Sequence, residues 1–287
     1  MIKKGIILAG GKGTRMSPLT KAVNKQLLPI HDKPLIFYPL SILMLAGIKE
    51  VLIIVNQGQL EQYKKIIPDG KNFGMKIDYI EQKNPNGLPE AFILGEKFIK
   101  NQNVCLILGD NFFYGQNLTK ILRSCTKLKN GAKVLLHRVN KPENFGIAKV
   151  IGKKIKNIKE KPKKFISDLA ITGLYFFDKK VCKFAKQLKP SKRGEIEIVD
   201  LLNKYLKDKK LSAELIGRGG AWLDTGSIED FYKTSAFVSA IENRQGFKIA
   251  CLEEIAFNNK WISKKQLLRA VKFYGNCSYS HYIKKLI

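Results

Sequence analysis

Three short, nearly continuous apolar runs constrain the fold of this chain more than any other feature of its sequence. They cover residues 6–9, 50–55 and 103–108. Runs of this length, bounded by glycine or polar residues, are typical of strands buried on both faces of a parallel sheet. Helices are expected around these runs, at residues 34–47, 60–67 and 88–99, with a further strand at residues 76–81. This alternation predicts βαβ units in a three-layer α/β/α mixed sheet.

The second half of the chain has a less regular pattern. Two strands that pair across Gly152 and one further strand are expected at residues 147–151, 154–159 and 170–175. The acidic stretch 193–200 predicts the start of a helix, because negative charge near a helix N-terminus interacts favourably with the helix dipole. Capping of that helix is sufficient to explain these residues, and we leave them out of the site. Helices are also expected at residues 228–243 and 261–272. We therefore divide the chain into a core, residues 1–227, and a mainly helical C-terminal appendage, residues 228–287. Aromatic side chains in the appendage suggest packing against the core or against another subunit.

The charge of the chain limits its partners. The 287 residues carry a formal net charge of +28, which by itself suggests a nucleic acid or another acidic partner. Only seven of the 52 basic residues are Arg, and these are scattered. Proteins that read bases rely on Arg for bidentate contacts. We interpret the charge mainly as a lysine-rich solvated surface and expect no nucleic-acid partner, although a nucleic-acid-binding module remains an alternative.

Cysteine, histidine and apolar residues point to a soluble cytoplasmic protein. The five cysteines are dispersed and form no Cys-x-x-Cys motif, as expected of reduced thiols. The three histidines are far apart in the sequence and suggest neither a metal cluster nor a catalytic triad. The apolar run 6–9 is too short for a signal peptide or a membrane span. We expect no membrane partner.

A glycine-rich loop follows the first strand. Its three glycines and the two cations after them are Gly10, Gly11, Gly13, Arg15 and Lys25. Glycine N–H groups can approach anionic oxygens closely because no Cβ intervenes, and a guanidinium with an ammonium group suits a polyphosphate. The P-loop sequence is absent, and Met16 stands where the dinucleotide motif has its third glycine. An ordinary strand-to-helix turn is the alternative interpretation.

Two aspartates each follow an apolar run and precede a turn. Asp110 follows the predicted strand 103–108, and Asp224 has the same kind of setting far downstream. A buried carboxylate needs a cation or hydrogen-bond donors, and hard oxygen ligands in ones and twos hold Mg²⁺ beside phosphates. We predict that Asp110 and Asp224 form a Mg²⁺ site. For Asp110, capping of the next turn is the alternative.

The motif Gly-Gly-x-Gly-Thr-Arg at residues 10–15, followed by Lys-x-Leu-Leu-Pro at residues 25–29, resembles the signature of the sugar-phosphate nucleotidyltransferases. The resemblance covers essentially the whole chain and implies the Rossmann-like nucleotidyltransferase fold. It is strongest to the short bacterial members that transfer a thymidylyl group from dTTP to α-D-glucose 1-phosphate with Mg²⁺ and supply dTDP-rhamnose pathways. A homotetramer with a regulatory nucleotide site at a subunit interface is implied as well. Two alternatives remain. The chain could catalyse the same reaction with UTP, CTP or another sugar 1-phosphate, or it could be a non-catalytic relative that acts as a regulatory subunit.

The same resemblance implies roles for individual residues. The catalytic residues, which would neutralise the pyrophosphate and the α-phosphate, are Arg15 and Lys25. The nucleotide would be bound by Leu8, Ala9, Gly10, Gly11, Gly13, Thr14, Gln82, Pro85 and Gly87, with Gln82 and the backbone around Gly87 contacting its base. The sugar phosphate would be bound by Asn111, Gly146, Glu160, Lys161 and Ile171. Phe145 stands where related chains usually carry Tyr, so a hydroxyl contact near the sugar is missing or supplied elsewhere.

Overall fold

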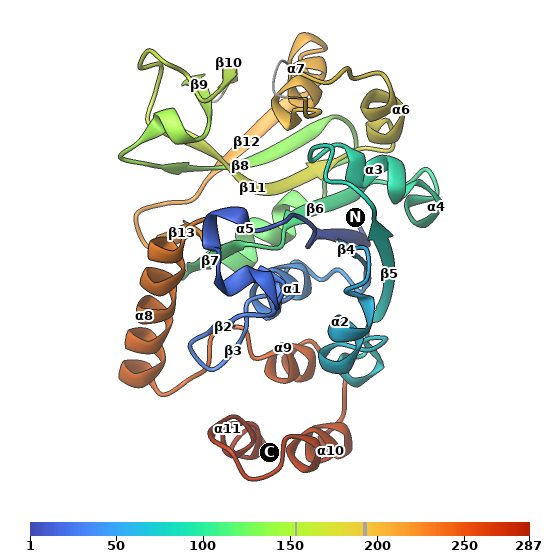
Figure 1. Cartoon of the computed structure of the whole chain (residues 1–287), viewed down its shortest axis with the longest axis vertical. Helices are drawn as coiled ribbons and strands as arrows, with labels where there is room; N and C mark the ends of the chain where they lie inside the picture. The colour runs from blue at the N-terminus through green and yellow to red at the C-terminus, as the bar shows by residue number, and fades with distance from the viewer. Residues whose placement is uncertain (153, 192–193) are drawn as a thin grey trace.

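A computed structural model describes residues 1–152, 154–191 and 194–287 (Figure 1). The main sheet is built from β1 (Lys4–Leu8), β4 (Glu50–Asn56), β5 (Lys76–Gln82), β6 (Val104–Leu108), β8 (Ala132–Arg138), β9 (Gly146–Ile151), β10 (Lys154–Glu160), β11 (Leu169–Phe177) and β12 (Leu211–Leu215). The strand order is β10-β9-β11-β6-β1-β4-β5, and β8 pairs with both β11 and β12. The strands predicted from the sequence are all present.

The sheet is mixed, as predicted, because its two halves run differently. β1 is parallel to both β4 and β6, and β5 continues the parallel half beyond β4. β11 is antiparallel to β6 and opens the second half. Since the chain passes to opposite sides of β1 on its way to β4 and to β6, their carboxyl ends flank a crevice of the kind that binds ligands in α/β proteins.

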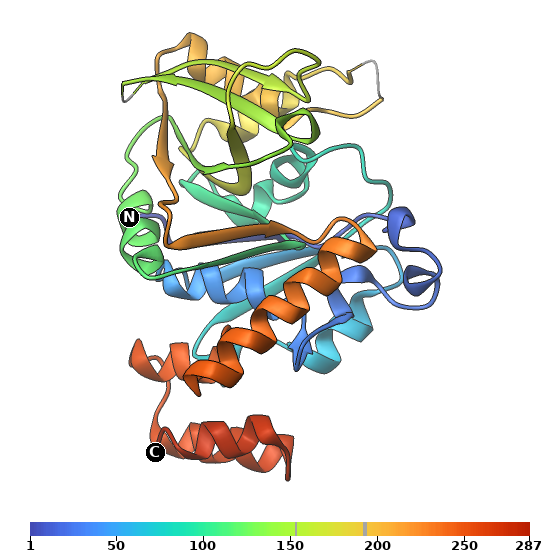
Figure 2. The ribbon, with the colours of Figure 1, turned by 90° about the vertical axis from the view of Figure 1, so that its left-hand side faces the viewer.

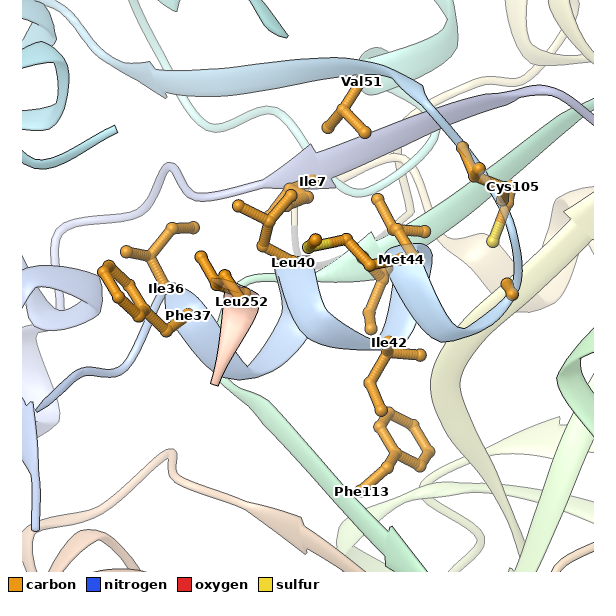
Figure 3. Close-up of a cluster of buried hydrophobic side chains, with 14 of the residues drawn as sticks. Ile7, Ile36, Phe37, Leu40, Ile42, Met44, Val51, Cys105, Phe113 and Leu252 are labelled. Carbon is orange, nitrogen blue, oxygen red and sulfur yellow. The ribbon is translucent and has the colours of Figure 1, made fainter. Parts of the chain in front are cut away.

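Alternate residues of the central strands face two separate cores, which explains the three layers. Ile7 packs with α1 (Phe37–Leu45) and α5 (Leu118–Cys125), whereas its neighbour Ile6 packs with α3 (Glu90–Leu94), α6 (Val181–Lys186) and α7 (Ile198–Lys207). Figure 3 shows the first of these cores around Ile7, with Leu40 and Met44 of α1 against it. Side chains that alternate in this way require apolar residues at every strand position, which is the pattern of the three apolar runs.

Two helix predictions need correction. The segment 88–99 forms two short helices, α3 and α4 (Glu96–Ile99), because Gly95 interrupts it. A Cβ at Gly95 would lie 3.1 Å from Ile6 and 3.2 Å from Leu52, so glycine allows this close approach to the sheet at the expense of helix continuity. The helix predicted within 193–200 begins only at Ile198, with Glu197 as its N-cap. Arg193, the first residue of that predicted stretch, lies outside the described residues.

Several short elements were not predicted. They are the hairpin β2 (Pro29–Ile30) and β3 (Lys33–Pro34), the strand β7 (Asn111–Gly115) with its pairing to β13 (Gly220–Asp224), and the elements β8, β12, α5 and α6. Short 3-10 helices also occur: η1 (Thr14–Met16), η2 (Leu19–Lys21), η3 (Lys25–Leu27), η4 (Lys71–Phe73) and η5 (Pro142–Asn144). The helix expected at 60–67 is α2 (Leu60–Ile66). The β7–β13 pair matters most for function because it joins two distant segments beside the crevice.

The C-terminal part is helical, as predicted. It comprises α8 (Ile228–Gln245), α9 (Leu252–Asn258), α10 (Lys264–Tyr274) and α11 (Ser278–Lys284). Figures 1 and 2 place α10 and α11 at the end of the molecule opposite β9 and β10. Leu252, Ala256 and Ile283 nevertheless belong to the same buried cluster as α1. The division at residue 227 and the role of the appendage as a subunit interface stay predictions. Within the described residues, no helix is both long and apolar enough to cross a bilayer.

Candidate active site

The glycine-rich loop leaves β1 and turns into η1, which begins at Thr14. Gly11 has a φ of 108° and Gly13 a φ of 59°, conformations that favour glycine. Asn56, at the end of β4, holds Gly11 from both sides: its Oδ1 accepts from the Gly11 N–H at 2.8 Å, and its Nδ2 donates to the Gly11 carbonyl at 2.9 Å. Asn56 was missed from sequence, although it directly follows the predicted strand 50–55 and ends the observed β4. The Gly11 N–H is therefore engaged within the protein, and its contact with a phosphate remains a prediction.

A cavity of about 240 Å³ lies beside this loop. Gly11, Lys25 and Pro85, all assigned to the site from sequence, are among its lining residues, together with Lys12 and Lys83. Three ammonium groups around one cavity create a positive potential that attracts a polyanion. Leu8, one of the predicted residues, is the last residue of β1. Ala9 follows it just before the loop and is fully buried, with its N–H bonded to the Ile54 carbonyl at 2.8 Å.

Lys25 opens η3 and reaches the carboxyl end of β6. Its side chain is 10% exposed, and its Nζ forms an ion pair with Asp110, whose side chain is 23% exposed. Burial would raise the pKa of Asp110, but the charge and hydrogen bond of Lys25 and a hydrogen bond from Asn111 lower it overall. Asp110 is therefore held as a carboxylate. Sequence reasoning assigned both residues to the site and did not foresee their pairing.

Asp224 comes to the same place through the pairing of β7 with β13. In that register Asp224 lies opposite Asn111, and the N–H and hydroxyl of Thr225 donate to the Asp110 carbonyl at 3.0 and 2.8 Å. Burial and then the negative charge of Asp110 raise the pKa of Asp224, while the charges of Lys25 and Arg15 oppose the rise. Two carboxylates are thus held together at the end of two strands.

Arg15 joins this group of charges from the glycine-rich loop. A Cβ at Gly226 would lie 3.2 Å from a guanidinium nitrogen of Arg15 and 3.3 Å from a carboxylate oxygen of Asp224. Arg15, Lys25, Asp110 and Asp224 therefore surround one point at the crevice. The two carboxylates present hard oxygen atoms to that point, and their mutual repulsion is what a divalent cation relieves, so the donor set fits a metal such as Mg²⁺.

Asn111 is buried and anchors the next residues of the site. Its Oδ1 accepts from Trp222 Nε1 at 2.6 Å and from the Gly173 N–H at 3.0 Å, and its Nδ2 donates to Asp110 at 3.0 Å. The Trp222 ring also lies against Phe145, with ring centroids 5.2 Å apart. Asn111 thus orients Asp110, a role that the sequence did not suggest, while its assigned contact with a sugar hydroxyl stays a prediction.

The loop assigned to base recognition is packed tightly. Gln82 ends β5 with 3% of its surface exposed, and its amide donates to Glu90. A Cβ at Gly10 would lie 2.7 Å from Gln82 Oε1, so Gly10 makes room for this amide. Gly87 has a φ of 115°, and a Cβ there would lie 2.1 Å from the Ile196 carbonyl. Gln82 and Gly87 are therefore held by contacts within the protein, and their contact with a base stays a prediction.

Four of the five residues assigned to the sugar phosphate lie on, or directly after, β9, β10 and β11, whereas Asn111 begins β7. Gly146 lies opposite Glu160 in the β9–β10 register, and a Cβ at Gly146 would lie 3.1 Å from Glu160 Oε2. The Lys161 N–H donates to the Phe145 carbonyl at 3.0 Å. Ile171 is on β11, next to Ala170, which pairs with Ile147 of β9. The structure thus brings four residues that are up to 25 positions apart in the chain onto adjoining strands.

One cluster outside this site places a histidine beside two carboxylates, a grouping that the sequence did not suggest. Ligand atoms of His31, Asp32 and Glu242 lie within 4.8 Å of one another. Lys33 contacts Glu242 at 2.9 Å and Lys248 contacts it at 3.2 Å, and both lysines also pair with Asp32. The two carboxylates are therefore already compensated by two ammonium groups, which makes this cluster a structural ion-pair network.

The fold and this site define a nucleotidyl transferase. The family described as nucleotidyl transferase matches residues 4–241, and the chain belongs to that family. The resemblance noted in the sequence is thereby confirmed, together with the fold it implied.

Individual proteins in the comparison are more specific. The chain is 48% identical over 285 residues to the glucose-1-phosphate thymidylyltransferase of Neisseria meningitidis, covering 99% of both chains. It is 42% identical over 286 residues to the enzyme of the same name from Mycolicibacterium smegmatis, again covering 99% of both. A solved structure of a putative glucose-1-phosphate thymidylyltransferase from Bacillus anthracis, in complex with a sucrose, matches with a TM-score of 0.76 and 39% identity over 82% of this chain and 94% of that one. A UDP-glucose pyrophosphorylase in complex with UDP-glucose matches with a TM-score of 0.73 and 29% identity over 85% and 100% of the two chains.

Proposed function

We propose that the chain transfers a thymidylyl group from dTTP to α-D-glucose 1-phosphate, giving dTDP-glucose and pyrophosphate. The observation that carries this proposal is the meeting of Arg15, Lys25, Asp110 and Asp224 at one point of the crevice. The lysine-lined cavity lies on one side of that point, and β11, which carries Ile171, is bonded to Asn111 through the Gly173 N–H. Relatives 42% and 48% identical that carry the name glucose-1-phosphate thymidylyltransferase support the choice of substrates.

The reaction needs positioning and charge neutralisation more than proton transfer. A phosphate oxygen of the sugar phosphate attacks the α-phosphorus of the nucleotide in line, and the bond to the leaving pyrophosphate breaks. Because a phosphate monoester has a second pKa of about 6, its oxygen is already ionised at neutral pH and requires no general base. Arg15 would neutralise charge on the pyrophosphate and Lys25 on the α-phosphate, as in other phosphoryl-type transfers.

Asp110 and Asp224 would hold the divalent metal that the donor set fits. When bound, the metal supplies positive charge that draws phosphate oxygens together and stabilises the negative charge that develops during transfer. The Lys25 ammonium lowers the pKa of Asp110 and so keeps that carboxyl group ionised. We extend the proposal to Mg²⁺ as the metal, to a homotetramer and to a cytoplasmic location.

UTP is the second candidate nucleotide. The chain matches a UDP-glucose pyrophosphorylase with 29% identity and a TM-score of 0.73, and this similarity supports testing UTP beside dTTP. The two nucleotides differ at the base and at the ribose, so neither the phosphate cavity nor the charged residues around Asp110 separates them.

Pyrophosphate release measured over pairs of nucleotides and sugar phosphates tests the proposal. The pairs combine dTTP, UTP, CTP and ATP with α-D-glucose 1-phosphate, galactose 1-phosphate and mannose 1-phosphate, with and without Mg²⁺. We expect the highest kcat/KM for dTTP with glucose 1-phosphate and no turnover after chelation of the metal. Selective turnover of UTP would replace the thymidylyl assignment, and release of no pyrophosphate from any pair would overturn the enzymatic one.

A further inference from the structure

Three amide side chains form a hydrogen-bonded network beside the cavity of about 240 Å³ at the glycine-rich loop. Asn56 comes from the end of β4, Gln59 from the residue before α2, and Asn24 from the residue before η3. Gln59 Oε1 accepts from Asn24 Nδ2 at 2.6 Å and from Asn56 Nδ2 at 3.2 Å. One oxygen atom therefore joins two side chains that belong to different segments of the site.

The two ends of this network are fixed to the two segments that carry the phosphate chemistry. At one end Asn56 binds the N–H and the carbonyl of Gly11, as a neighbouring strand would. At the other end Asn24 Oδ1 accepts from the Gln26 N–H at 2.9 Å and from the hydroxyl of the fully buried Tyr63 at 2.8 Å. These bonds fix the backbone on either side of Lys25.

The placement of these residues connects the network to the ligand. Asn24, Asn56 and Gln59 all line the cavity of about 240 Å³ that also contains Gly11 and Lys25. A phosphate chain bound there has to meet the glycine-rich loop and Lys25 at the same time. An error of about 1 Å in such a separation can reduce a rate by roughly 100-fold.

We infer that Gln59 is a positioning residue, whose Oε1 sets the separation between the glycine-rich loop and Lys25 by accepting from Asn56 and Asn24 together. The inference rests on the proposed function in that a nucleotide is taken as the ligand of the cavity. Gln59 acts through Gly11 and Lys25 and is not itself a catalytic residue. Its role requires an acceptor at that atom, which a Glu side chain also provides and a Met side chain of similar length does not.

Three full-length variants test this. Gln59→Met removes the acceptor and leaves the Asn24 amide without its bond, Gln59→Glu retains the acceptor, and Gln62→Met is the matched control on the exposed face of α2. Calorimetric titration with dTTP in the presence of Mg²⁺ gives affinity without turnover. Pyrophosphate release gives kcat and the KM for each substrate, and thermal unfolding reports the integrity of the fold.

We expect Gln59→Met to weaken dTTP binding about tenfold, as the loss of one bridging acceptor implies, and to lower kcat while the KM for glucose 1-phosphate stays within about twofold. Gln59→Glu should have a kcat within about threefold of that of the unmodified chain. Gln62→Met should have the same kcat and dTTP affinity as the unmodified chain. Wild-type dTTP affinity and kcat in Gln59→Met, or equal losses of kcat at saturating dTTP in the Glu and Met variants, would overturn the inference. Failure of the unmodified chain to turn over any substrate pair would instead overturn the proposed function, whereas the calorimetric comparison would still test Gln59.

Discussion

Replacing Lys25 by Met separates the structural from the chemical role of the ion pair with Asp110. The variant leaves the Asp110 carboxylate facing Asp224 without its nearest cation. Removing one partner of a buried pair costs about 3–5 kcal/mol, and the 23% exposure of Asp110 reduces this because water can partly solvate the remaining charge. We expect a loss of about 2–3 kcal/mol of unfolding free energy, which lowers Tm by roughly 3–6 °C.

The same substitution should reduce turnover much more than the stability change explains. Loss of one group that stabilises developing charge reduces kcat about 10²–10³-fold. The double variant Lys25→Met/Asp110→Asn removes both charges, so it should recover more than half of the lost Tm and none of the lost turnover. Thermal unfolding followed by circular dichroism and pyrophosphate release at 25 °C measure the two effects. Turnover within tenfold of the unmodified chain, or a double variant less stable than the single one, would refute this reasoning.

Three further predictions concern the base loop, the metal and the buried acid of the appendage. Gly87→Ala should lose roughly 3 kcal/mol of stability and bind dTTP at least tenfold more weakly by calorimetry, because its Cβ would lie 2.1 Å from the Ile196 carbonyl at a φ of 115°. Gly58→Ala, at a φ of 81° with open space around it, is the control. Equal dTTP affinities of the two variants would contradict the role given to the loop around Gly87. Asp224→Asn should raise the Mg²⁺ concentration for half-maximal activity at least tenfold without changing Tm by more than a few degrees, and an unchanged requirement would remove Asp224 from the metal site. Burial raises the pKa of Glu253 from its ordinary value of 4.5 despite hydrogen bonds from two tyrosines, so its favourable contribution is complete below that value and is lost as pH rises through the folded-state pKa. The Tm of Glu253→Gln relative to the unmodified chain should therefore increase from pH 4 to pH 8, and a pH-independent difference would contradict this assignment.

Much of the parallel half of the sheet could be predicted because its signals are local. Ile6 and Ile7 are both apolar since alternate side chains of β1 enter two different cores, and the same holds for β4 and β6. The sequence pattern was weaker for short strands that are stabilised mainly by pairing with a strand far away in the chain. β7 and β13 are each held mainly by the other, so the five residues of each strand carry little periodicity of their own.

The site divides in the same way. Chemical type, position relative to strand ends and the resemblance to a known family together predicted Arg15, Lys25, Asp110 and Asp224 as candidates for a phosphate and metal site. Their mutual arrangement was not contained in those local patterns. The ion pair of Lys25 with Asp110 joins residues 85 positions apart, and the β13–β7 register brings Asp224 beside them from still farther along the chain.

Asn56 and Gln59 show why the remainder required the tertiary structure. Asparagine and glutamine are ordinary residues at the end of a strand and in a loop, so their identity predicts no particular partner. Only when the sheet places β4 beside β1, and the fold brings the residue before η3 to the residue before α2, do these amides meet Gly11 and Asn24. The sequence by itself determined which groups carry charge and which strands are buried, because both follow from residue type and local periodicity. The tertiary structure decided which groups neutralise, orient and bridge one another, because hydrogen bonds and ion pairs depend on distances between segments that the chain order does not specify.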